Sequence, residues 1–163
     1  MQSIEQIKEI LNLIDLPDIT NLATEKQNED YEGAVFSINQ TTYRSRLTKL
    51  TPKKNGYFVA FWEKDSNNTN QAFSYAESPD FLILSIIDEN KKGQFVFPKE
   101  VLHKQKILRS ESQKGKMAIR VYPSWETDLN PTATKTQKWQ LPHFVDLSED
   151  IDVVKLTKLY KKG

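Results

Sequence analysis

The sequence contains no cysteine among its 163 residues, which excludes disulfides and thiolate chemistry. Histidine is almost as scarce. Only His103 and His143 occur, and neither has a second histidine or a cysteine at a metal-ligand spacing. The five glycines are scattered and form neither a phosphate-binding loop nor the Gly-x-Ser-x-Gly motif of a nucleophilic serine. We therefore expect no metal, no cofactor and no catalytic nucleophile.

Long apolar runs and a large net charge are missing as well. No stretch approaches the length of a membrane span, and the first nine residues lack the basic start and apolar run of a signal peptide. We expect a cytoplasmic protein without a membrane partner. The net charge of +1 creates no overall field that would attract nucleic acid from a distance, so any such binding must be local. The length suits a single domain over residues 1–163.

Charge is nevertheless distributed unevenly along the chain. Residues 1–32 are rich in Asp and Glu, with only Lys8 and Lys26 as cations. Residues 42–56 are purely basic and carry Arg44, Arg46, Lys49, Lys53 and Lys54. A second basic segment, residues 99–120, includes Lys116 and Arg120. The near-zero total therefore conceals an acidic start and two basic segments.

The hydrophobic pattern changes period along the chain, which predicts a mixed α/β domain. Apolar residues at helical spacing predict an N-terminal helix over about residues 2–14. Alternation over residues 43–50, a turn over 52–56 and a second strand over 57–62 predict a hairpin. The unbroken apolar run 81–87 suits a central strand covered on both faces. Further expected elements are a strand at 94–97, a helix after Pro98, a strand at 117–122, a helix within 132–144 and a C-terminal helix over about 150–161.

One short pattern resembles a catalytic signature. Asp80, Glu89 and Lys91 superficially spell the PD-(D/E)XK motif, in which two carboxylates hold a divalent cation and a lysine assists the attacking water. If residues 81–87 form one extended strand, Asp80 and Glu89 lie roughly 30 Å apart at about 3.3 Å per residue. A shared metal ion cannot bridge that distance, so we interpret these residues as a strand entry and a solvated turn.

Aromatic residues accompany the basic segments. Tyr43, Tyr57 and Trp62 lie in the hairpin, Tyr122 and Trp125 follow Arg120, and Trp139 follows Lys138. Cations neutralise phosphates while flat rings stack on unpaired bases, so this combination favours a surface for RNA or single-stranded DNA. The competing interpretations are that strand cations prevent edge pairing and that strand aromatics belong to the core. On an extended strand, Arg44 and Arg46 face one side and Lys49 the other.

An ordered set of motifs over about residues 30–145 resembles the MepB family. These motifs are Tyr43-Arg44, Lys49, Thr51-Pro52-Lys53-Lys54, Gly56, Phe58-Val59, Trp62, Gly93-Gln94-Phe95-Val96-Phe97-Pro98-Lys99, Gly115-Lys116, Arg120-Val121-Tyr122-Pro123, Trp125 and Gln137-Lys138-Trp139-Gln140. Members of that family are known from a staphylococcal multidrug-efflux operon. The resemblance implies a restriction-endonuclease-like α/β fold, a central mixed sheet flanked by helices, in which the catalytic carboxylates and lysine are not retained. It also implies nucleic-acid binding rather than cleavage.

On this basis we predict a nucleic-acid interface centred on residues 49–54 and 116–120. The predicted contact residues are Arg44, Arg46, Lys49, Lys53, Lys54, Lys116, Arg120, Tyr122, Trp125 and Trp139. Two other functional classes stay open. One is an active metal-dependent nuclease with carboxylates paired in another way, to which Glu32 could contribute. The other is a module in which Arg44, Lys49 and Arg120 bind a small anionic ligand or a protein partner.

Overall fold

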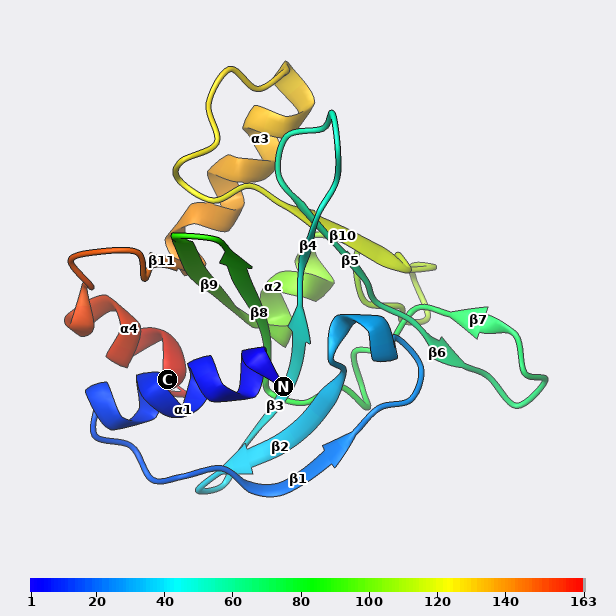
Figure 1. Cartoon of the computed structure of the whole chain (residues 1–163). Coiled ribbons are helices and arrows are strands. Elements are labelled where there is room, and N and C mark those ends of the chain that lie inside the picture. Colours follow the sequence, from blue (N-terminus) through cyan, green and yellow to red (C-terminus); the bar gives the residue numbers. More distant parts are fainter. Residues whose placement is uncertain (163) are drawn as a thin grey trace.

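A six-stranded mixed sheet forms the middle of the molecule in the computed structural model, which describes residues 1–162 (Figure 1). Its strands follow the order β1 (Thr20–Thr24), β2 (Ala34–Ile38), β3 (Thr41–Leu47), β8 (Phe81–Asp88), β9 (Lys91–Pro98) and β11 (Phe144–Asp146). β3 and β8 run parallel, and all other neighbours in the sheet are antiparallel. The predicted central mixed sheet is therefore confirmed.

Strand β8 is buried on both faces, as its unbroken apolar run predicts. Phe81 and Ile83 point into one hydrophobic core, whereas Leu82 and Leu84 point into a second. Helices α1 (Gln2–Leu13) and α4 (Val153–Tyr160) contribute to the first core. The second contains side chains from α2 (Lys99–Lys104), α3 (Pro131–Gln140) and a smaller sheet. The helices thus flank the central sheet within one domain.

The smaller sheet consists of β4 (Lys49–Leu50), β5 (Tyr57–Ala60) and β10 (Ala118–Val121), with β5 in the middle. The predicted hairpin is present, because Lys49 pairs with Phe58 across it. Its first strand is not continuous, however. The backbone N–H and hydroxyl of Thr48 both donate to the carbonyl of Ser85, at 3.0 and 3.1 Å, and the chain passes there from the central sheet to the smaller one. A third pair, β6 (Glu63–Lys64) and β7 (Asn70–Gln71), forms a projecting arm (Figure 1).

The predicted helices are present with shorter bounds. The helix expected within 132–144 ends at Gln140, since Pro142 belongs to the 3-10 turn η2 (Leu141–His143), and the chain then enters β11. Helix α4 begins only after Asp152, whose carboxylate accepts a hydrogen bond from the N–H of Lys155 at 3.0 Å. A further 3-10 turn, η1 (Glu29–Tyr31), precedes β2. Within residues 1–162, every helix is too short or too polar to cross a membrane.

Candidate functional site

Arg44 and Arg46, both predicted as nucleic-acid contacts, lie on β3 and share the carboxylate of Glu25. Arg44 Nε lies 3.0 Å and Arg46 Nη1 lies 2.7 Å from Glu25 Oε1. Arg46 also donates to the side-chain oxygen of Asn28 at 3.2 Å. Its side chain has 0% exposure, and the guanidinium of Arg44 lies 3.8 Å from the centre of the Phe73 ring. The assignment of Arg46 to the interface is therefore corrected, because its guanidinium is enclosed and already bonded inside the protein.

The electrostatics of this cluster support a structural role. Burial alone would raise the pKa of Glu25, but the charges and hydrogen bonds of Arg44 and Arg46 outweigh that effect and lower the pKa below its ordinary value. Glu25 thus remains ionised between two guanidinium groups. Arg44 keeps 12% exposure and is similarly committed to Glu25, so we also leave it out of the candidate site.

The remaining cations of the first basic segment have a different environment. Lys53 and Lys54 are exposed on the turn between β4 and β5, where Lys53 adopts a left-handed conformation with φ of 65°. Lys49 is exposed on β4, and its Nζ lies 4.7 Å from the centre of the Tyr31 ring. Within the part of the chain that the structure describes, none of these three lysines forms an ion pair.

Arg120 holds this turn against β10. Its guanidinium donates to the carbonyl of Asn55 at 3.3 Å and to the hydroxyl of Thr51 at 3.2 Å. Gly56 lies close to Tyr122, the residue that follows β10. A Cβ added at Gly56 would be 2.8 Å from Cδ1 of Tyr122. Arg120 and Tyr122 therefore join the lysine-bearing turn to the structure beside it, and Arg120 acts there as a structural residue.

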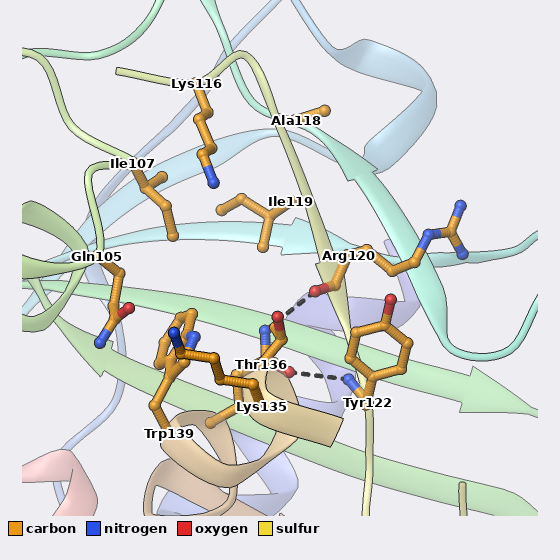
Figure 2. A pocket seen from close by; sticks show the side chains of 11 residues that line it. Gln105, Ile107, Lys116, Ala118, Ile119, Arg120, Tyr122, Lys135, Thr136 and Trp139 are labelled. Atoms are coloured by element: carbon orange, nitrogen blue, oxygen red, sulfur yellow. Dashed lines mark hydrogen bonds between the residues drawn. The ribbon is translucent and has the colours of Figure 1, made fainter. Parts of the chain in front are cut away.

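A pocket of about 300 Å³ lies on the other side of this join, between β10, α3 and the segment after α2 (Figure 2). Its wall includes Lys116 and Arg120 from the second basic segment, Tyr122 just after that segment, and Trp139 from α3. Figure 2 shows Lys116 on one side of the pocket and Lys135 with Trp139 on the other. Among the described residues, no Asp or Glu lines the pocket, and neither lysine has an ion-pair partner.

The third predicted aromatic contact, Trp125, has a different position. Its indole N–H donates to the hydroxyl of Tyr57 at 3.2 Å, and its ring meets Phe144 edge to face at a centroid distance of 5.7 Å. The Tyr57 hydroxyl in turn donates to Asp88 at 2.8 Å. Trp125 packs against the second core and does not line the pocket. The structure thus brings Lys116, Tyr122 and Trp139 together and leaves Trp125 in the supporting wall.

The carboxylates considered for catalysis are separated and have other partners. Asp80 precedes β8 and Glu89 follows it, so the two lie at opposite ends of an eight-residue strand. Asp80 accepts hydrogen bonds from Thr42 and lies 2.9 Å from Lys162 Nζ. Glu32 accepts from the N–H and hydroxyl of Ser3, at the start of α1. Across residues 1–162, no group of three or more His, Asp or Glu side chains is arranged to hold a metal ion.

Comparison with known proteins identifies the family. A family model described as MepB-like matches residues 25–146. The chain belongs to the MepB-like family. A solved structure described as the crystal structure of MepB is 44% identical, with a TM-score of 0.81, over 90% of this chain and 98% of that chain. No curated protein matches the chain. The resemblance found in the sequence motifs is confirmed, together with the mixed α/β architecture.

Lys135 and Gln105 line the pocket but were not among the predicted contact residues. Lys135 lies four residues before Trp139, so the two share one face of a helix, and that spacing could have revealed it. Gln105 follows α2 and reaches the pocket only because of the tertiary arrangement. No sequence pattern indicates it.

Proposed function

We propose that the protein binds RNA or single-stranded DNA in preference to duplex, without cleaving it. The observation that supports this most is the clustering of exposed, unpaired lysines on two adjoining features. Lys53 and Lys54 lie on the β4–β5 turn, while Lys116 and Lys135 lie at the pocket. Arg120 connects the turn to β10, so a bound strand could contact both features.

The chemistry of these groups favours a phosphate backbone. Lysines without acidic partners attract phosphates and release bound counterions when they do so, which supplies affinity without sequence preference. Trp139 adds a flat apolar surface, on which unpaired bases stack. In a duplex the bases are paired and stacked, and only the phosphates would be available to this surface. The arrangement therefore suits single strands better than duplexes.

The sequence resemblance supplies the wider context of this proposal. The resemblance implies that the fold is related to PD-(D/E)XK nucleases and that the protein is associated with a drug-resistance operon. The separation of Asp80 from Glu89 along β8, and the bonds that already occupy Asp80 and Glu32, favour binding over metal-dependent cleavage.

Fluorescence anisotropy with short labelled single-stranded RNA, single-stranded DNA and duplex DNA tests the proposal. Each titration is run at two salt concentrations, with and without Mg²⁺, and the strands are then examined on a denaturing gel. We expect salt-sensitive binding that is tighter for single strands, with every strand intact. Absence of binding to all three would contradict the proposal and favour a small anionic ligand or a protein partner. Mg²⁺-dependent cleavage would assign the protein to the nucleases.

A further inference from the structure

We propose that the pocket beside α3 holds one nucleotide unit, with its base against Trp139 and its phosphate between Lys116 and Lys135. This inference rests on the proposed function, because a single strand would present such a unit with its base unstacked. The pocket volume of about 300 Å³ is at the lower end of the range for small-ligand pockets, so the pocket suits one nucleotide rather than several.

Trp139 is suited to stacking because its ring is held in place. It packs against Phe97 of the central sheet, with a centroid distance of 5.5 Å and an interplanar angle of 49°, while still lining the pocket. The side chain remains partly exposed. A ring that is fixed on one side and accessible on the other loses little conformational freedom when a base stacks on it.

The polar groups of the pocket divide into those that hold its wall and those that remain available. Gln140 is occupied at both ends of its amide, accepting from the N–H of Tyr122 at 2.9 Å and donating to the carbonyl of Arg120 at 3.0 Å (Figure 2). These two bonds tie α3 to β10 and fix the shape of the pocket. Because Gln140 is also fully buried, it belongs to the wall of the pocket.

Gln105, Lys116 and Lys135 are among the groups that remain available. Within residues 1–162, the side-chain amide of Gln105 forms no hydrogen bond, and neither lysine has an ion-pair partner. An amide offers both a donor and an acceptor, which matches the edge of a base. Two lysines from different elements provide the charge that a phosphate needs, and no carboxylate of the lining opposes them. A fixed ring, a free amide and two cations together match the parts of a nucleotide.

Two variants and a matched control test this assignment. Trp139→Leu keeps an apolar side chain against Phe97 but removes the stacking surface. The double variant Lys116→Ala with Lys135→Ala removes the charge at the pocket. Lys138→Ala is the control for the lysines, because Lys138 is exposed on the same helix and does not line the pocket. Circular dichroism and thermal melting establish whether each variant is folded. If Trp139→Leu does not fold, the lysine variants still test the assignment.

Two kinds of probe are used. Binding of AMP and UMP is measured by tryptophan fluorescence, and binding of a labelled single-stranded oligonucleotide is measured by anisotropy. We expect both nucleotides to quench the wild-type fluorescence, and this quenching to be lost in Trp139→Leu and weakened in the double lysine variant. Oligonucleotide affinity should fall about tenfold in Trp139→Leu with an unchanged salt slope, as expected for one stacked base. In the double variant the salt slope should decrease by about 0.7, as expected for the loss of one phosphate contact with a single strand. Lys138→Ala should behave like the wild type in the nucleotide titrations.

The outcomes separate this inference from the proposed function. If the oligonucleotide binds the wild type and both pocket variants equally, the pocket assignment is overturned and the proposed function stands. If no oligonucleotide binds but AMP or UMP quenches the wild type and not Trp139→Leu, the nucleotide assignment is supported and the proposed function fails. If neither probe binds, both are overturned.

Discussion

Arg44 and Arg46 lie in the same basic segment as Lys53 and Lys54, yet the two pairs occupy opposite environments. The arginines are on β3, have side chains that are 12% and 0% exposed, and share the carboxylate of Glu25. The lysines are exposed on a turn and have no acidic partner within residues 1–162. Planar guanidinium groups can bond a common carboxylate from fixed directions, whereas a lysine ammonium is most stable when hydrated. The same formal charge therefore stabilises the fold in one half of the segment and is available for binding in the other.

The largest expected effect comes from removing the carboxylate between the arginines. Glu25→Ala would leave Arg46 fully buried without its acidic partner, and breaking a buried ion pair in this way typically costs about 3 kcal/mol. We expect the free energy of unfolding in urea to fall by that order. Glu29→Ala, an exposed acid in the same region, is the control and should change it by less than about 0.5 kcal/mol. Equal stability of the two variants would show that the cluster does not support the fold.

A second prediction concerns the join between the turn and β10. Gly56 has φ of +84°, and an added Cβ would lie 2.7 Å from the carbonyl oxygen of Val121. Gly56→Ala should therefore lower the free energy of unfolding by about 1 to 3 kcal/mol and weaken nucleic-acid binding by displacing the turn. Thermal melting and anisotropy measure the two effects. Asn55→Ala is the matched control, because Asn55 bonds Arg120 only through its backbone carbonyl, and it should leave both quantities nearly unchanged.

Acid unfolding should reveal the same arginine cluster. Because the pKa of Glu25 is lower in the folded protein than in the unfolded chain, its ionisation stabilises the fold above its ordinary pKa. This contribution is lost as the pH falls through the lowered pKa. We expect Glu25→Gln to be less stable than the wild type at neutral pH, and the difference to shrink as the pH falls below about 4.3, the ordinary value for Glu. Urea titrations across this pH range measure the difference, and a constant gap would contradict it.

The sequence predicted the elements whose pattern is local. The apolar run of β8, the helical spacing in α1 and the proline before α2 each specify their element without reference to distant residues. Strands β1, β2, β6, β7 and β11 were not predicted, although β2 alternates between buried and partly buried residues. β1 is exposed at every position and so lacks a hydrophobic pattern, while β11 has only three residues and follows a predicted helix. Both are recognisable mainly through their pairing with distant strands.

The candidate site shows the same division between local and tertiary information. The proximity of cations and aromatic residues in the sequence predicted Lys116, Tyr122 and Trp139 as contact residues, and these three line one pocket. The burial of Arg46 against Glu25 could not be predicted from the basic segment alone. Glu25 lies 21 residues earlier, in a stretch whose sequence shows only an excess of acidic residues. Pairing across that separation depends on the route of the chain from η1 into β2 and β3.

The smallest structural effect, and the most direct test of the comparison, is expected from the turn lysines. Lys53→Ala with Lys54→Ala should leave the free energy of unfolding within about 0.5 kcal/mol of the wild type, since both side chains are exposed and unpaired. Anisotropy should show weaker binding by a similar factor for different sequences, with the salt slope reduced by about 1.4 for a single strand.

The control for that variant removes two lysines from the opposite side of the central sheet. Lys158→Ala with Lys161→Ala changes the net charge equally but affects α4 and its end, which adjoin the first core rather than the turn. If the turn lysines contact phosphates directly, only their removal lowers the salt slope. An equal loss in both double variants would mean that overall charge, and not position, governs binding, and the distinction between the two kinds of cation in the basic segment would then apply to stability alone.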